Sequence, residues 1–237
     1  MKKFFLLMFL WANSHLASAQ AIWVNYSFKT NWGDRAAVAE LFKNYLESEG
    51  GQSFSGRMYL VSTVINGPNP STHNAAFVYK SEKDWEARRA ALLTNANPDF
   101  SKFISELTSK VEFVDETVFS HVAGFGLPAE QTKQWFGVGV EVKNLKRYQA
   151  AIKEIEKTEI AEQASFDLWT VTAGGSPGIT HYVTVGVESR ADFNSNEAVQ
   201  KAFAAVESKV SSIRKLKGIN YGDTVFTHGP LKSEEYR

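Results

Sequence analysis

The chain contains no cysteine among its 237 residues. This absence excludes structural disulfides, thiol nucleophiles, cysteine-ligated zinc or iron–sulfur centres and acylation at a lipobox cysteine. There is also no excess of charge, because 26 lysine and arginine residues balance 26 aspartate and glutamate residues. A neutral chain has no global basic field that would gather nucleic acid or anionic lipid. We therefore expect no nucleic-acid partner and a ligand that is recognised locally.

No apolar run is long enough to cross a bilayer. The longest, Phe4 to Ala12, spans about nine residues, whereas a membrane-spanning helix needs roughly 20. It follows two lysines and precedes the small-residue pattern Ala17-Ser18-Ala19, which is the order of a cleaved secretory signal peptide. The alternative is a retained amphipathic or core helix. The sequence predicts that residues 1–19 are removed and that the mature protein, beginning near Gln20, is periplasmic or secreted and makes no membrane contact.

The remaining chain contains two similar segments in tandem. Residues 115–121 (DETVFSH) reappear as residues 222–228 (GDTVFTH) at a spacing of 107, and the Thr-His pair at positions 72 and 73 reappears at positions 180 and 181. The strand-like segment that begins at Trp23 aligns with the one that begins at Trp135, 112 positions later. Anchors in the same order at nearly constant spacing indicate an internal duplication.

Both segments show the same order of hydrophobic periodicities, in which alternation predicts strands and helical spacing predicts helices. In the first segment we expect strands at 22–29, 57–65, 73–79 and 111–121, with helices from about 34 to 50 and over 82–107, the latter interrupted near Asn97-Pro98. In the second we expect strands at 135–142, 166–172, 180–187 and 219–228, with helices at 145–161 and 196–213. Each segment therefore has the β-α-β-β-α-β order of a ferredoxin-like unit.

A ferredoxin-like unit has both helices on one face of its sheet and leaves the other face bare. Two copies can cover each other's bare faces. This arrangement resembles the dimeric α/β-barrel superfamily, in which two ferredoxin-like units pack sheet to sheet, here fused in one chain. The resemblance implies an α+β fold and a monomer with an internal pseudo-dimer; the alternative is two independent domains. The expected organisation is a signal peptide (1–19), a first repeat (20–121), a linker (122–134), a second repeat (135–229) and a C-terminal tail (230–237).

The four histidines of the mature chain occupy equivalent places in the two repeats, at His73, His121, His181 and His228. We expect the start of the third strand and the end of the fourth to lie at the same edge of each sheet, which would bring two imidazoles together. Because imidazole is the commonest metal ligand, all four are candidates for a metal site. However, strands one place removed are about 9.6 Å apart, and no His-x-His spacing occurs. This favours a structural role, with His73 and His181 facing the helices.

The first strand of each repeat presents one row away from the helices, with a large aromatic residue followed by small or polar residues. Trp23 and Trp135 beside such residues leave room for a small ligand, although the same aromatics can simply fill the core. Glu141 is a further polar group that we expect at such a cavity, where a buried carboxylate could act as a general base. The predicted ligand-binding residues are Trp23, Asn25, Trp135, Thr184, Glu188, His121 and His228.

The functional prediction is an exported α/β-barrel protein that binds a small apolar or aromatic metabolite between its sheets. The superfamily implies cofactor-free oxygenase or isomerase-like chemistry by analogy. The alternatives are a non-enzymatic binding or stress-associated domain and a metal-binding protein that uses the paired histidines. The sequence requires no cofactor: some superfamily members bind haem through a helical histidine, and the predicted helices contain none. It identifies no catalytic residue and leaves open whether the protein is an enzyme.

Overall fold

The computed structural model describes residues 20–67, 69–93 and 97–237. The predicted signal peptide, residues 1–19, lies outside the described residues. The strands are β1 (Ile22–Thr30), β2 (Arg57–Ile65), β3 (His73–Tyr79), β4 (Val111–Gly126), β5 (Gln134–Val142), β6 (Ala164–Gly174), β7 (His181–Val187) and β8 (Arg214–His228). The α-helices are α2 (Arg35–Glu47), α3 (Glu49–Gln52), α4 (Glu82–Leu93), α5 (Pro98–Thr108), α6 (Leu145–Glu156), α7 (Arg190–Ser195) and α8 (Glu197–Val210).

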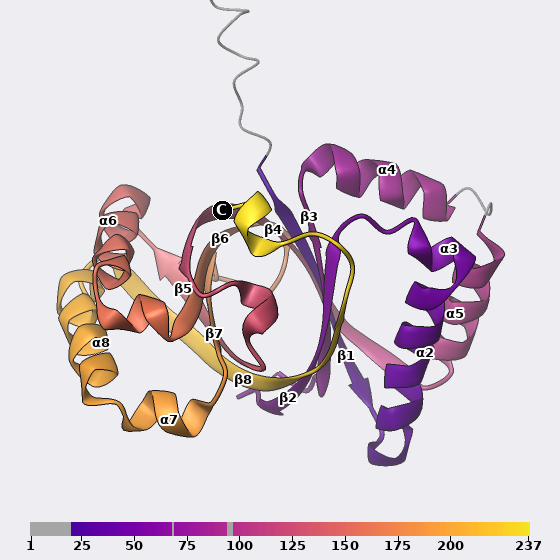
Figure 1. The fold of residues 1–237 in the computed structure, drawn as a ribbon, viewed down its shortest axis with the longest axis horizontal. Coiled ribbons are helices and arrows are strands. Elements are labelled where there is room, and N and C mark those ends of the chain that lie inside the picture. The colour runs from indigo at the N-terminus through magenta and orange to yellow at the C-terminus, as the bar shows by residue number, and fades with distance from the viewer. Residues whose placement is uncertain (1–19, 68, 94–96) are drawn as a thin grey trace, which may run out of the picture.

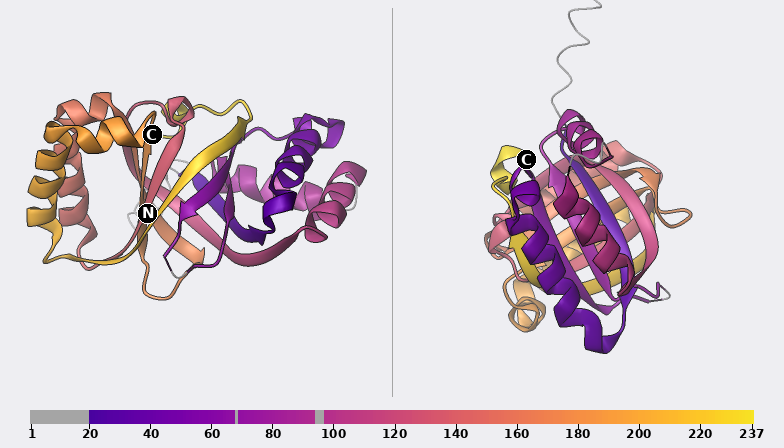
Figure 2. Two further views of the ribbon diagram at one scale, coloured as in Figure 1. Left: turned by 90° about the horizontal axis from the view of Figure 1, so that it is seen from below. Right: turned by 90° about the vertical axis from the view of Figure 1, so that its right-hand side faces the viewer.

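Within the described residues, the eight strands form one closed barrel in the order β1-β3-β2-β8-β5-β7-β6-β4. Every pairing between neighbouring strands is antiparallel. The helices form two layers on opposite sides of this barrel, α2 to α5 on one side and α6 to α8 on the other (Figures 1 and 2). The predicted α+β fold class is confirmed. Among the helices of the described residues, none combines the length and apolar character needed to span a bilayer.

The two halves of the barrel have the same internal strand order, β4-β1-β3-β2 in the first and β8-β5-β7-β6 in the second. The edge strand β2 of the first half pairs with β8, and β4 pairs with β6, so hydrogen bonds join the halves at both edges. Closure in this way removes the free strand edges that each four-stranded sheet would otherwise expose.

Because side chains alternate along each strand, one face of the sheet packs against the helices and the other lines the inside of the barrel. On β1, Val24 and Phe28 pack against the helices, whereas Trp23 and Asn25 face the inside of the barrel. The same alternation elsewhere gives a helix-side core in each half and an interior cluster inside the barrel. The interior cluster has the buried members Tyr59, Val78, Phe119, Ala129, Trp169 and Leu231.

Several element boundaries differ from the predicted ones. β4 continues to Gly126, through residues predicted to begin the linker, because its second part forms the hydrogen-bonded pairing with β6. β8 begins at Arg214 rather than at 219 because it pairs with the end of β5. Helix α6 ends at Glu156, earlier than predicted, and a short 3-10 turn follows. Long-range pairing, which a local pattern does not contain, sets the extra strand length.

The C-terminal segment crosses one end of the barrel (Figure 1). Leu231 belongs to the interior cluster and Tyr236 packs against it. Arg57 donates a 2.8 Å hydrogen bond from Nε to the Leu231 carbonyl oxygen. This end of the barrel is therefore covered by the chain itself.

Candidate functional site

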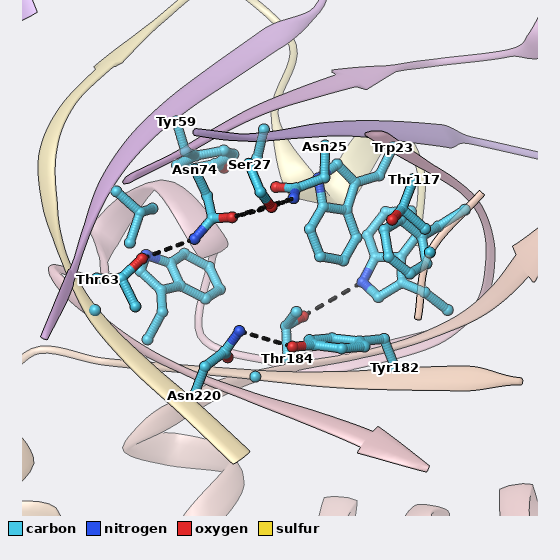
Figure 3. Close-up of a pocket in the computed structure, with 18 of the residues that line it drawn as sticks. Trp23, Asn25, Ser27, Tyr59, Thr63, Asn74, Thr117, Tyr182, Thr184 and Asn220 are labelled. Carbon is cyan, nitrogen blue, oxygen red and sulfur yellow. Dashed lines mark hydrogen bonds between the residues drawn. The ribbon is translucent and has the colours of Figure 1, made fainter. Parts of the chain in front are cut away.

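A cavity of about 170 Å³ lies inside the barrel (Figure 3). All eight described strands contribute to its wall, among them β1 with Trp23, β3 with Asn74 and β8 with Asn220. An engineered apolar cavity of about 150 Å³ is large enough to bind benzene. The space inside this barrel therefore suits a small ligand with an aromatic ring.

One part of the cavity wall is built from aromatic rings. Trp23 stacks on Phe119 with ring centroids 4.2 Å apart and contacts the edges of Trp169 at 5.5 Å and Tyr182 at 6.0 Å. Tyr59 and Trp135 meet edge to face at 5.6 Å. Offset-stacked and edge-to-face pairs of this kind fix the orientation of each ring. The aromatic wall is thus held by its own contacts and offers ring faces and edges to a ligand.

A chain of uncharged polar groups lines the part of the cavity nearer the β2–β3 loop (Figure 3). Asn74 accepts hydrogen bonds at Oδ1 from the Ser27 hydroxyl at 2.7 Å and from Asn25 Nδ2 at 3.2 Å. Its own Nδ2 donates to Thr63 Oγ1 at 2.9 Å. The carboxamide of Asn74 is therefore oriented by three neighbours and provides a positioned amide beside the cavity.

Tyr182 and Asn220 lie opposite this chain (Figure 3). Asn220 Nδ2 donates a 2.7 Å hydrogen bond to the Tyr182 hydroxyl oxygen. Burial raises the pKa of Tyr182 to about 12, despite the lowering effect of that hydrogen bond. The hydroxyl is therefore neutral at physiological pH and keeps its hydrogen. Nearby, Trp169 Nε1 donates to Thr184 Oγ1 at 3.3 Å.

Two donors on the cavity wall have no partner among the described residues. They are the indole Nε1 of Trp23 and the hydroxyl of Tyr59, and both atoms are buried. Burial also raises the pKa of Tyr59, so its hydroxyl stays protonated. Because buried polar groups are nearly always hydrogen-bonded, these two donors mark places where an oxygen acceptor on a ligand would be favourable.

Two carboxylates line the cavity, and sequence analysis predicted neither. Asp167 is neutralised: Arg237 Nη2 lies 2.8 Å from Oδ2, and His121 Nε2 lies 3.0 Å from Oδ1. Asp115 accepts from Thr117 Oγ1 at 3.3 Å and has no cationic partner within 4.0 Å among the described residues. It faces Ser27 across the β1–β4 pairing. The alternation of Asp115 with Thr117 and Phe119 was the signal in the sequence, but its direction could not be read there.

Four of the predicted ligand-binding residues line the cavity: Trp23, Asn25, Trp135 and Thr184. His121 lies next to the cavity wall, with its ring centroid 4.8 Å from that of Trp169. Its imidazole binds Asp167. The small and aromatic residues in the predicted rows of β1 and β5 therefore face the interior of the barrel.

Glu188, Glu141 and His228 lie elsewhere. Strand β7 ends at Val187, so Glu188 lies beyond the barrel wall, exposed and paired with Lys133. Lys217 is an extra, bulged residue of β8 opposite the step from Gly139 to Val140, and its Nζ binds Glu141 at 2.7 Å outside the cavity. That lysine lowers the pKa of Glu141. His228 is half-buried at the end of β8, opposite Met58, and is not among the residues that line the cavity.

The expectation that two histidines meet at one sheet edge is wrong. His73 pairs with Phe28 near the end of β1, whereas Ser120, the neighbour of His121, pairs with Ile22 at its beginning. Since β3 and β4 both run antiparallel to β1, the start of one and the end of the other lie at opposite ends of the barrel. Within the part of the chain that the structure describes, no group of three histidine or acidic side chains is placed to hold a metal ion.

The imidazoles of His73 and His181 each have a neighbouring threonine hydroxyl that fixes the ring. His73 stacks on Phe28, with centroids 5.6 Å apart, and its Nδ1 lies 3.0 Å from Thr72 Oγ1. His181 Nδ1 lies 2.8 Å from Thr180 Oγ1. Burial lowers the pKa of both histidines, and for His73 to about 4. Both are thus neutral near pH 7 and belong to the packing of the strand starts.

The described residues do not fit a haem that is ligated from a helix. All four described histidines lie on strands, and none of the described helices carries one. His73, His121 and His181 are buried, and each has a ring nitrogen next to a hydroxyl or carboxylate. None of the four described histidines is among the residues that line the barrel cavity, so none is placed to ligate a haem bound there.

No family model and no curated protein matches the chain. Solved structures do match it. A protein from Fusobacterium nucleatum that is provisionally named a monooxygenase aligns with a TM-score of 0.63 and 13% identity, over 90% of this chain and 97% of that one. A similarly named protein from Lactobacillus acidophilus gives 0.59 and 10%, over 90% and 99%. A haem-binding protein from Thermus thermophilus gives 0.52 and 8%, over 87% and 92%. At these identities the similarity shows a fold of the dimeric α/β-barrel type.

Proposed function

We propose that the barrel cavity binds a small, uncharged aromatic metabolite and carries out oxygenase-like chemistry on it without a bound cofactor. The observation that carries this proposal is the cavity of about 170 Å³, walled by aromatic rings on one side and by neutral amides and hydroxyls on the other. A ring fits the aromatic wall, and one or two oxygen atoms on the ligand meet the donors of Trp23 and Tyr59. The fold shared with the monooxygenase-named proteins supports the choice of reaction.

Asp115 is the residue that we propose as the general base. It lines the cavity and, among the described residues, has no cationic partner such as Arg237, which neutralises Asp167. A base next to a bound ring can remove a proton from an acidic C–H or O–H group. Amide donors such as Asn74 and Asn220 then stabilise the anion that forms. Oxidation of a ring CH2 group by O2 to a carbonyl leaves the second oxygen atom as water, so the reaction needs no other reductant.

Binding can be tested with 2-naphthol, followed by quenching of tryptophan fluorescence and by calorimetry. Ala76 lines the cavity, and Ala76→Leu places three more carbon atoms in it. We expect this variant to weaken binding at least tenfold. The matched control is Ala75→Leu on the other face of the same strand, which should leave the affinity unchanged. Equal affinities of Ala76→Leu and the unchanged protein would overturn the assignment of the site.

Catalysis is tested separately, by oxygen uptake with an aromatic ketone no larger than 2-naphthol that has an acidic ring CH2 group, such as 2-indanone. Asp115→Asn should abolish the uptake and retain the binding of 2-naphthol, since the amide keeps the shape of the side chain but cannot accept the proton. Binding without oxygen uptake in the unchanged protein would favour the alternative of a non-enzymatic binding domain.

We further propose that the two halves arose by tandem duplication and act as an internal pseudo-dimer. The matching strand orders and the repeated sequence anchors support this, and because the chain closes its own barrel we expect a monomer in solution. Light scattering coupled to size-exclusion chromatography measures the mass directly; a dimer would contradict the proposal.

Export is the last part of the proposal. It rests on the order of charged, apolar and small residues over positions 1–19. Expression of the full chain in a Gram-negative host should yield a periplasmic protein whose mass corresponds to a start near Gln20. Retention of the intact chain in the cytoplasm would contradict it.

A further inference from the structure

We propose that the first half of the chain contains a second binding site, outside the barrel, for a small apolar monocarboxylate. A cavity of about 180 Å³ lies between the first half-sheet and its helices α2, α4 and α5, on the opposite face of the sheet from the barrel cavity. We call it the outer pocket. Its wall is almost entirely apolar and rich in aromatic rings, including Phe42, Phe77, Phe100 and Phe103.

The outer pocket exists because helix α4 does not fill the space beside the sheet. None of the residues of α4 is buried. In the second half, the helix at the equivalent place in the chain, α7, buries Phe193. Figure 1 shows α4 lying across the end of the layer that α2 and α5 form. The helix-side core of the first half is therefore incomplete where that of the second half is packed.

Arg88, on α4, is the charged residue among those that line the outer pocket. Its guanidinium donates from Nη2 to the Tyr45 hydroxyl at 2.5 Å and from Nη1 to Ser53 Oγ at 2.7 Å. Nη1 also reaches the Gly50 carbonyl oxygen at 3.3 Å. These partners are neutral, and within the described residues no carboxylate lies within 4.0 Å of Arg88. Arg88 thus forms no direct ion pair, although the Asp99 carboxylate lies in the same neighbourhood, where it accepts from Gly50 N at 2.9 Å.

This combination of charge and apolar wall selects the chemistry of the ligand. A guanidinium next to an apolar space favours an anionic group, and a carboxylate can accept from Arg88 Nε, because both Nη atoms already donate to Tyr45, Ser53 and Gly50. The Tyr45 hydroxyl accepts from Arg88, and its own hydrogen has no acceptor among the described residues, so it can donate to the same carboxylate. Burial raises the pKa of Tyr45, which keeps that hydrogen in place. The rest of the ligand then lies among phenylalanine rings.

The pocket is reachable and of limited size. Phe113, which lines it, is 48% exposed, and Leu92 and Ile104 are half-buried at its margin. A volume close to that of a benzene-binding cavity admits one ring with a short chain and excludes long-chain lipids. The predicted ligand is thus a monocarboxylate of about the size of 3-phenylpropanoate.

The test compares 3-phenylpropanoate with 3-phenylpropanol, its uncharged analogue, by calorimetry at pH 7. We expect the carboxylate to bind at least tenfold more tightly than the alcohol. Arg88→Met should remove this preference, while the alcohol still binds and thereby shows that the pocket is folded. Arg88→Lys should keep part of the preference, because the charge remains without the Nε–H donor and the hydrogen bonds that fix the guanidinium. Ala75→Leu, which fills the outer pocket, should weaken both ligands.

Ala76→Leu, which fills the barrel cavity, separates this proposal from the proposed function, because it should leave carboxylate binding unchanged. Equal affinities of the two ligands for the unchanged protein would overturn the proposal. So would a carboxylate preference that survives Arg88→Met, or binding that is lost in Ala76→Leu and kept in Ala75→Leu. Failure of 2-naphthol to bind the barrel would contradict the proposed function and would not affect this result.

Discussion

Ala75 and Ala76 are consecutive residues of β3 that face two different cavities. Ala75 lines the outer pocket and Ala76 lines the barrel cavity. They pair with Tyr26 and Asn25 of β1, whose side chains follow the same alternation. Because side chains alternate along a strand, a single small residue on each face leaves room on both sides of one sheet. The two cavities are therefore separated by one layer of backbone and can be altered independently.

Ala76→Leu should stabilise the protein in the absence of ligand. The new side chain extends into free space and buries apolar surface, and cavity-filling substitutions typically add about 0.5 to 2 kcal/mol. Urea unfolding monitored by circular dichroism measures the change. A loss of more than about 1 kcal/mol would mean that the substitution overpacks the site and that the free space is smaller than described.

Arg237→Met should lower stability strongly. Arg237 is bound to Asp167 through two nitrogens, Nε at 3.0 Å and Nη2 at 2.8 Å, and both side chains are largely buried. Removing one partner of a buried pair leaves an uncompensated charge and costs about 3 to 5 kcal/mol. Thermal unfolding should show a large decrease in Tm.

The matched control is Lys80→Met, which breaks the exposed pair between Lys80 and Glu235 at 3.7 Å. Exposed pairs contribute little, so the Tm should hardly change. If the two variants had similar stability, the ion pair of Arg237 would not contribute to the covering of the barrel end.

Acidification should destabilise the fold through His73. Burial, with a smaller effect of the nearby Arg35 charge, lowers the pKa of His73 from 6.5 to about 4. The unfolded chain therefore binds a proton below pH 6.5 that the folded chain binds only near pH 4. The free energy of unfolding is therefore unaffected by this histidine above pH 6.5 and decreases, by about 3 kcal/mol at most, as the pH falls toward 4.

Urea midpoints measured from pH 7 to pH 4 test this linkage. In His73→Gln the midpoint should fall less steeply over that range than in the unchanged protein. The comparison variant His228→Gln removes a half-buried imidazole at another strand end. A pH dependence that is identical with and without His73 would show that other groups account for it.

Local patterns were sufficient to predict the strands and the direction of the barrel-facing rows. Trp23, Asn25, Trp135 and Thr184 line the cavity because alternation on β1, β5 and β7 is regular. The carboxylates were predicted wrongly for a physical reason. Glu188 lies beyond the end of β7, whereas Glu141 keeps the parity of β5 but lies near the end of that strand, where the bulged residue Lys217 of β8 binds it outside the cavity.

The residues that were missed depend on contacts between distant parts of the chain. Asp167 meets Arg237 and His121 only after the barrel closes, and Asn220 meets Tyr182 across two strands. His73 and His121 do not meet, because β3 and β4 both run antiparallel to β1 and place the start of one and the end of the other at opposite ends of the barrel. The outer pocket could not be predicted from sequence, since it depends on how far α4 lies from the sheet.

Gly126→Ala should destabilise the junction between the two halves. Gly126 ends β4 with φ at +85°, a conformation that residues with a Cβ rarely adopt. A Cβ there would lie 2.1 Å from the carbonyl oxygen of Ala164, which accepts the 2.9 Å hydrogen bond from Leu127 N. Backbone strain and the steric conflict together should cost at least about 2 kcal/mol.

Gly218→Ala is the control within β8. Its Cβ would meet no atom within 4 Å, and the residue is exposed, so this change should alter stability by less than about 0.5 kcal/mol or improve it slightly. Urea unfolding of both variants gives the comparison. If Gly126→Ala were as stable as Gly218→Ala, the turn from β4 toward β5 would tolerate a left-handed alanine, and the tight approach of this turn to Ala164 would not be needed to close the barrel.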